Sequence, residues 1–168
     1  GASGIQTSVV GLGAWVLGGG SVWGKDTDDQ ESIATIQAAV DCGINLIDTA
    51  PAYGFGRSET VVGRAIRGRR ERVVLATKCG NKMSERPNEQ QYSRPWVLRE
   101  CEASLQRLDT DVIDLYYLHR FDKTVAVEDS VGELARLVAE GKLRAIGLSE
   151  VSAPTLRRGP RPPRGSAC

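Results

Sequence analysis

The sequence predicts an α/β protein built around a parallel sheet, and three observations support this prediction. Short runs rich in Val, Ile and Leu take turns with segments whose apolar residues recur at helical period. Within the runs, apolar and polar residues alternate only weakly, which is typical of strands buried on both faces. The spacing of roughly 30 residues per strand and helix suits a βα repeat. We therefore expect five consecutive βα units.

The first unit is expected to combine a strand at residues 9–15 with a helix that begins after Thr27. Thr27 and Gln30 have the spacing of a capping box. Gly43 is a typical residue to follow the end of the helix. One apolar face of this helix is formed by Ile33, Ile36, Ala39 and Val40.

The second and third units continue the pattern, with strands at residues 43–48 and 73–77 and a helix at 58–66. A polar loop follows at residues 80–92. Ser93 is the expected cap of the next helix, and Pro95 stands in its first turn, where its missing N–H costs nothing. The apolar face of that helix comprises Val97, Leu98, Cys101, Leu105 and Leu108.

The remaining units are a strand at residues 112–119, a helix at 128–140 that Gly141 ends, and a strand at 142–149. We assign residues 1–158 to one domain. Residues 159–168 are rich in Pro, Arg and Gly and have no apolar periodicity, so they are expected to be disordered. They are either a natural tail or the product of a shifted reading frame or truncating splice. A shifted frame in GC-rich DNA favours codons for Gly, Pro, Arg and Ala, so we favour the second interpretation.

Composition excludes several classes of function. The 22 basic and 21 acidic side chains leave a net charge of +1, and no long basic stripe predicts a nucleic-acid partner. The most apolar stretch, residues 9–23, is interrupted by glycines and too short to span a bilayer, so we expect neither signal peptide nor membrane anchor. The 4 cysteines form no CxxC pair and there is 1 histidine, which argues against a zinc site and for a reducing, cytoplasmic location.

Four polar residues lie at or just after the carboxyl ends of the predicted strands: Asp48, Tyr53, Lys78 and His119. Because parallel strands bring their carboxyl ends to one face, these side chains are expected to converge. Singly, each has a simpler explanation: a turn cap, a loop residue, a solvated strand end and a structural histidine. Together they favour a catalytic site.

A dinucleotide-binding fingerprint is not expected near the amino end of the chain. Gly11 and Gly13 begin such a motif, but Val16 occupies the place of its third glycine. The glycines at 18–20 lack the Lys and Ser of a phosphate-binding loop and are expected to form a flexible loop.

Several segments resemble the signatures of the aldo-keto reductases. They read NLIDTAPAYG at residues 45–54, followed by Ser58 and Glu59, then ATK at 76–78, DLYYLH at 114–119 and AIGLS at 145–149. The resemblance extends from Gly4 to about Arg158. It implies a (β/α)₈ TIM-barrel type of fold that is incomplete here, with about five βα units present and the last three missing, since a closed barrel needs about 250 residues.

The resemblance also implies an activity, the NADPH-dependent reduction of aldehydes or ketones to alcohols. Tyr53 would protonate the carbonyl oxygen, and Lys78 would lower the pKa of this phenol while Asp48 keeps Lys78 charged and oriented. His119 would hydrogen-bond the substrate oxygen. The resemblance assigns Ser149 and Asp48 to the cofactor site. After Ser149 the family commonly has Asn, whereas this chain has Glu150.

The expected ligands are therefore NADP and a small carbonyl compound, with neither nucleic acid nor membrane as a partner. Five units leave the first and last strands unpaired, so self-association through these edges is expected. The alternative is a catalytically silent fragment, or a partner-binding and regulatory module, derived from an aldo-keto reductase.

Overall fold

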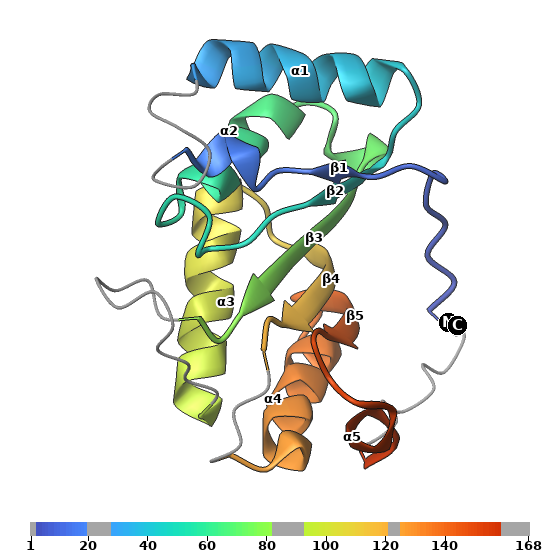
Figure 1. Ribbon diagram of the computed structural model, residues 1–168, viewed down its shortest axis with the longest axis vertical. Helices are drawn as coiled ribbons and strands as arrows, with labels where there is room; N and C mark the ends of the chain where they lie inside the picture. The colour runs from blue at the N-terminus through green and yellow to red at the C-terminus, as the bar shows by residue number, and fades with distance from the viewer. Residues whose placement is uncertain (1–2, 20–27, 82–92, 121–124, 159–168) are drawn as a thin grey trace.

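The computed structural model describes residues 3–19, 28–81, 93–120 and 125–158. A parallel sheet in the order β1-β2-β3-β4-β5 runs through the centre of the molecule (Figure 1). Its strands are β1 (Leu12–Gly13), β2 (Leu46–Asp48), β3 (Val74–Cys79), β4 (Ile113–Leu118) and β5 (Leu143–Leu148). Each strand pairs with its sequence neighbour, which confirms the predicted succession of βα units.

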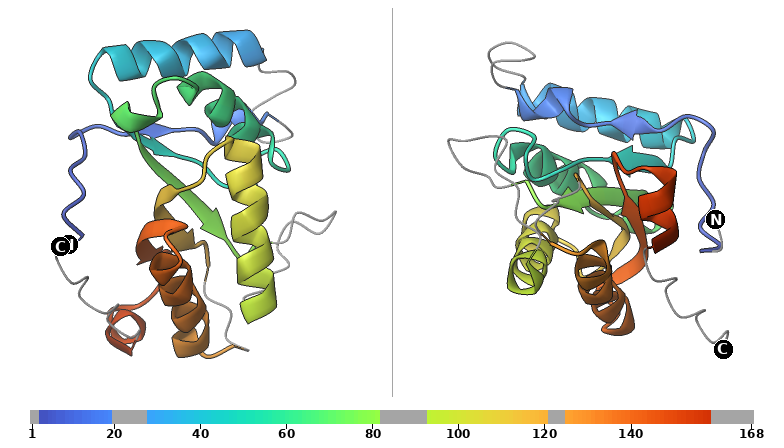
Figure 2. Two further views of the ribbon diagram at one scale, coloured as in Figure 1. Left: turned by 180° about the vertical axis from the view of Figure 1, so that it is seen from behind. Right: turned by 60° about the horizontal axis from the view of Figure 1, so that its bottom comes forward.

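Helices connect the successive strands and pack along one side of the sheet (Figures 1 and 2). They are α1 (Asp29–Asp41), α2 (Arg57–Ile66), α3 (Arg94–Leu108) and α4 (Val127–Ala139), and a short further helix, α5 (Ala153–Arg158), follows β5. Two 3₁₀ turns are also present: η1 (Val16–Gly18) follows β1, and η2 (Arg70–Arg72) precedes β3. Each of α1, α2 and α3 contacts the next helix along the chain, so the helical layer follows the strand order.

The hydrophobic core lies between this helical layer and the sheet. Ile36 of α1, Val62 of α2, Leu75 of β3 and Leu134 of α4 are fully buried. Burying a side chain of this size stabilises a fold by about 1.5–3 kcal/mol relative to leaving it exposed. The periodic apolar faces of the sequence therefore correspond to the layer that holds the strands in place.

The first strand is much shorter than predicted. The sequence predicts it over residues 9–15, but only Leu12 and Gly13 pair with β2, opposite Ile47 and Asp48. Val9 is fully exposed, and after Gly13 the chain turns into η1. The prediction was too long because it counted every apolar residue of this segment as part of the strand. A residue is part of a strand only where it pairs with a neighbouring strand, and here the pairing with β2 is limited to Leu12 and Gly13.

The predicted cap of α1 is also wrong by one position. Asp28 is the N-cap, and its carboxylate accepts a hydrogen bond from the Gln30 backbone N at 2.7 Å. A carboxylate is well suited to this place, since it also meets the positive end of the helix dipole. Thr27, residues 82–92 of the polar loop and the tail at 159–168 lie outside the described residues. Ser93 does stand at the N-cap of α3, but its side chain makes no capping hydrogen bond.

Candidate active site

Three strands deliver the predicted polar residues to one end of the sheet. Asp48 is the last residue of β2, Lys78 is next to last in β3, and His119 follows β4 directly. The backbone N of His119 donates to the Cys79 carbonyl oxygen at 2.9 Å, so the ladder continues one residue past the strand. Ser149 follows β5 in the same way, its backbone N donating to Leu118 at 3.0 Å.

Asp48 and Lys78 form a direct ion pair. The Lys78 Nζ atom lies 2.6 Å from Asp48 Oδ1 and also donates to the Thr49 carbonyl oxygen at 2.8 Å. Lys78 is only 8% exposed. Burial lowers the pKa of Lys78, and the attraction of Asp48 opposes that effect. The pair thus holds an ammonium group in place at the floor of the site.

Tyr53 lies in a tight turn between β2 and α2. Gly54, Phe55 and Gly56 all have positive φ angles, 65°, 53° and 89°, and the Gly56 N–H donates to Pro51 at 2.7 Å. Two of these three positions are glycines, which adopt such angles without steric cost. The turn places the tyrosine ring above the Asp48–Lys78 pair.

A glycine from another segment makes room for this turn. Gly18 is buried in η1, and a Cβ atom on it would lie 2.6 Å from the Tyr53 carbonyl carbon. This residue was expected to belong to a flexible loop. Instead it permits a close backbone contact that fixes the position of Tyr53.

Three side chains surround the Tyr53 ring. The Lys78 Nζ atom lies 5.1 Å from its centroid, the His119 ring meets it edge-on at 6.0 Å, and the Trp15 ring stacks on it at 5.8 Å. Trp15 was not among the site residues predicted from the sequence. Trp15 could have been found by its position, because it stands at the carboxyl end of the predicted first strand, and the other predicted strands have their site residues at or just after the same end.

The electrostatic effect on Tyr53 is opposite to the one expected. Burial and, to a smaller extent, the nearby Asp48 carboxylate together raise the pKa of Tyr53 to about 12. From the sequence, we expect Lys78 to lower this pKa. The pairing of Lys78 with Asp48 explains the difference, because the two charges largely cancel at the phenol and leave burial as the dominant effect.

His119 is neutral at physiological pH. Burial, together with the positive charges of Lys78 and Arg120, lowers the pKa of His119 to about 4. Its Nδ1 atom lies 3.3 Å from the side-chain Nδ2 of Asn81, a second residue that the sequence analysis did not single out. The site therefore brings together the protonated phenol of Tyr53, the neutral imidazole of His119 and the buried ammonium group of Lys78.

Glu150 departs from the Asn that is common in the family. It has a φ of 53°, a conformation that Asn adopts more readily than Glu. Its carboxylate lies 3.4 Å from the Arg120 guanidinium, on the exposed rim. Ser149 beside it is half-buried at the carboxyl end of the sheet.

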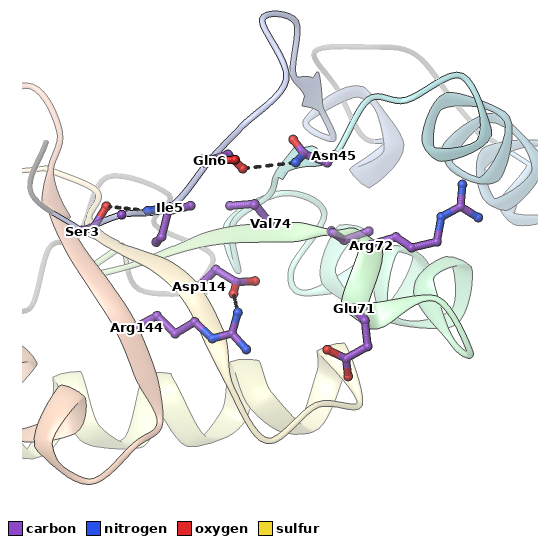
Figure 3. Close-up of a pocket in the computed structure, with 11 residues that line it drawn as sticks. Ser3, Ile5, Gln6, Asn45, Glu71, Arg72, Val74, Asp114 and Arg144 are labelled. Carbon is purple, nitrogen blue, oxygen red and sulfur yellow. Dashed lines mark hydrogen bonds and ion pairs between the residues drawn. The ribbon is translucent and has the colours of Figure 1, made fainter. Parts of the chain in front are cut away.

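A hollow of about 320 Å³ lies at the opposite end of the sheet, around the amino ends of β3, β4 and β5 (Figure 3). Its most buried charge, Asp114, pairs with Arg144 at 2.8 Å and with Arg70 at 2.7 Å. The Asp114 carboxylate also accepts the Leu75 backbone N–H at 2.8 Å. Its carboxylate is engaged by these protein partners, so we assign this end of the sheet to stability.

Two further features of the described residues concern metal binding and membrane spanning. No group of three or more His, Cys, Asp or Glu side chains there is arranged to hold a metal ion. None of the helices in the same part of the chain combines the length and the apolar character that crossing a membrane requires.

Fold and site together define an α/β protein of the parallel-barrel class whose polar cluster lies at the carboxyl ends of its strands. Residues 9–159 match the model of the aldo/keto reductase family. The chain belongs to this family.

Individual relatives agree with this assignment. Aldo-keto reductase YhdN of Bacillus subtilis is 47% identical over 152 residues, covering 89% of this chain and 45% of the relative. The NADH-specific methylglyoxal reductase of Escherichia coli is 43% identical over 171 residues, covering 94% and 52%. A crystal structure of an aldo/keto reductase from Klebsiella pneumoniae with NADP and acetate superposes with a TM-score of 0.76 at 36% identity, covering 89% and 49%.

The chain spans about half the length of the curated relatives that it matches. Its five strands and their helices are accordingly an incomplete (β/α)₈ barrel, as the sequence predicted.

Proposed function

We propose that this chain carries the catalytic centre of a nicotinamide-dependent oxidoreductase that reduces aldehydes or ketones to alcohols. The observation that carries the proposal is the cluster of Asp48, Lys78, Tyr53 and His119 at one end of the sheet. Four groups suited to carbonyl chemistry meet there although they come from three segments that are far apart in the sequence.

Tyr53 is the proposed general acid. Because its pKa is about 12, it stays protonated at neutral pH and can give its proton to the carbonyl oxygen as negative charge develops there. Lys78 stabilises the phenolate that this transfer leaves behind, and Asp48 holds Lys78 in position. His119, being neutral, donates a hydrogen bond to the same oxygen and orients the substrate.

Nicotinamide is the cofactor that suits the residues present, and when bound it would supply the hydride. The Ser149 hydroxyl can both donate to and accept from an amide, which is the chemistry of the nicotinamide carboxamide. Asp48 lies at the same end of the sheet. One relative was solved with NADP, and another is named as NADH-specific, so relatives support both nucleotides. We propose NADP as the cofactor of this chain.

The first test is a comparison of Tyr53→Phe with the unaltered chain. We expect the variant to bind NADPH with unchanged affinity, followed by fluorescence, and to lose at least about 100-fold in carbonyl turnover, the usual contribution of a positioned acid. The matched control is Tyr116→Phe, which removes a buried phenol from β4 that contacts the core. We expect this control to retain turnover.

Two outcomes would contradict the proposal. Unchanged turnover in Tyr53→Phe would remove Tyr53 as the acid. Failure of the unaltered chain to bind NADPH or NADH up to millimolar concentration would mean that this chain has no functional cofactor site, and would favour a partner-binding role.

A further inference from the structure

The environment of the His119 ring determines which of its nitrogens can carry the proton. The two ring nitrogens face different groups: Nδ1 lies 3.3 Å from the Asn81 amide nitrogen, whereas Nε2 is on the far side of the imidazole from this contact. Asn81 stands two residues after Cys79, whose carbonyl oxygen accepts the His119 backbone N–H at 2.9 Å. The same strand pairing thus sets the distance between Asn81 and the ring.

An amide NH₂ group can only donate hydrogen bonds. For this contact to be favourable, Nδ1 must present its lone pair, and the single proton of the neutral ring must then be on Nε2. A doubly protonated ring would set an N–H of His119 against an N–H of Asn81. The contact therefore favours both the neutral form and one of its two tautomers.

We propose that Asn81 is a positioning residue that holds His119 as the neutral Nε2–H tautomer, so that Nε2 can donate a hydrogen bond to the carbonyl oxygen. The inference rests on the proposed function, because it concerns the group that would meet the substrate. Among the described residues, the contact that joins Asn81 to the site is the one with this ring, so Asn81 acts through His119 and not on the substrate.

Charges around the ring favour the same state. Lys78 of β3 and Arg120 after β4 both oppose a positive charge on the ring. Their partners moderate this effect, because Asp48 pairs with Lys78 and Glu150 pairs with Arg120. Tyr53, which meets the ring edge-on, keeps its proton and adds no charge at neutral pH. These charges favour the neutral ring but do not distinguish its two tautomers. The contact with Asn81 does distinguish them.

The opposite tautomer would require the Asn81 amide to present its oxygen to a protonated Nδ1. In the structure this oxygen, Oδ1, is buried and has no hydrogen-bond partner among the described residues. The nitrogen is the atom that faces His119. The two arrangements differ in which ring nitrogen carries the proton, and this can be measured directly.

The chain contains 1 histidine, so nitrogen NMR of a ¹⁵N-histidine-labelled sample without a histidine tag reports on His119 alone. Long-range ¹H–¹⁵N spectra at neutral pH distinguish the two tautomers. We expect Nδ1 to resonate as an unprotonated nitrogen and Nε2 as a protonated one. A protonated Nδ1 in the unaltered chain would overturn the proposal without any variant.

Asn81→Asp tests the role of the amide itself. A carboxylate can only accept, so we expect the proton to move to Nδ1 and the pKa of His119 to rise by about 1 to 3. Gln106→Glu makes the same amide-to-carboxylate change at an exposed position at the far end of α3, and should alter neither property. If the two variants give the same tautomer and the same titration curve, Asn81 does not position His119.

Asn81→Ala provides a second variant in case the carboxylate prevents folding. Loss of the donor should shift the Nδ1 resonance downfield, because the hydrogen bond to its lone pair is gone. An unshifted Nδ1 resonance in a folded Asn81→Ala chain would contradict the contact.

These spectra need neither cofactor nor substrate, so their failure is distinguishable from failure of the proposed function. A chain that shows the expected tautomer shift but reduces no carbonyl compound would retain the Asn81 assignment and lose the reductase activity. In an active chain, Asn81→Asp should lower kcat at neutral pH while the KM for NADPH stays unchanged.

Discussion

At the scale of single residues, burial decides the protonation states in the site. Tyr53 and His119 both keep the neutral form that a low-dielectric environment favours, with pKa values moved in opposite directions, to about 12 and about 4. Lys78 is held beside a carboxylate in the same environment. The site therefore holds two neutral hydrogen-bond donors next to one compensated ion pair.

The low pKa of His119 should make the stability of the chain depend on pH. The folded chain keeps His119 neutral down to about pH 4, whereas the unfolded chain binds this proton near pH 6.5. Between those values the unfolded state holds more protons, so the free energy of unfolding falls as the pH is lowered through this window. His119→Asn removes the group, and we expect urea unfolding at several pH values to show a shallower dependence. The same slope in both proteins would contradict the low pKa.

At the scale of elements, a buried ionic network joins α2, α3 and β3 beneath the site. The Glu59 carboxylate of α2 is fully buried, accepts the Thr77 hydroxyl at 2.6 Å and pairs with Arg107 of α3 at 2.6 Å. Thr77 precedes Lys78 in β3. The network thus links the helical layer to the strand that delivers the ammonium group.

Breaking this network should be costly. Arg107→Met would leave the Glu59 carboxylate buried without its charged partner, which we expect to destabilise the fold by about 3–5 kcal/mol. Arg67→Met is the matched control, since Arg67 pairs with Asp109 at 2.8 Å on the exposed surface and should contribute about 0–1 kcal/mol. Denaturant unfolding measures both changes. Equal losses in the two variants would show that the buried pair has no special importance.

The contact between η1 and the Tyr53 turn gives a second prediction at this scale. Gly18→Ala would place a methyl group against the Tyr53 backbone, and we expect a loss of about 1–3 kcal/mol in stability together with displacement of the phenol. Gly13→Ala is the control in the neighbouring strand, because nothing lies within 4 Å of a Cβ atom there. Thermal unfolding of the two variants tests the contact. Equal stability would mean that η1 moves aside without cost.

At the scale of the whole molecule, the sheet has two open edges. Among the described strands, β1 pairs only with β2, and β5 pairs only with β4. Unpaired strand edges present free N–H and C=O groups that can pair with another chain. Self-association through these edges is therefore our proposal for the isolated chain.

We expect sedimentation velocity to show a mass that increases from low to high micromolar concentration, as edge pairing is concentration-dependent. Circular dichroism recorded alongside should show unchanged helix content, which separates association from unfolding. A single monomeric species over the whole range would rule out edge pairing under these conditions.

The sequence was most informative where regular spacing repeats. Alternating strands and helices, the apolar faces and the polar residues at the strand ends could all be predicted, because each depends on local periodicity and on the geometry common to parallel sheets. The first strand was predicted too long and the cap of α1 was misplaced by one residue. The length of the first strand depends on which residues have a partner in β2, and the cap of α1 depends on the neighbouring Asp28, which takes the N-cap position.

By itself, the sequence determined the order of the elements, the parallel α/β class and which residues stand at the strand ends, because these follow from the chain's own periodicity. Only the tertiary structure decided the protonation of Tyr53 and His119, the close contact of Gly18 with the Tyr53 turn and the approach of Asn81 to the imidazole ring. These depend on burial and on distances between segments far apart in the chain. Such distances exist only once the strands have paired.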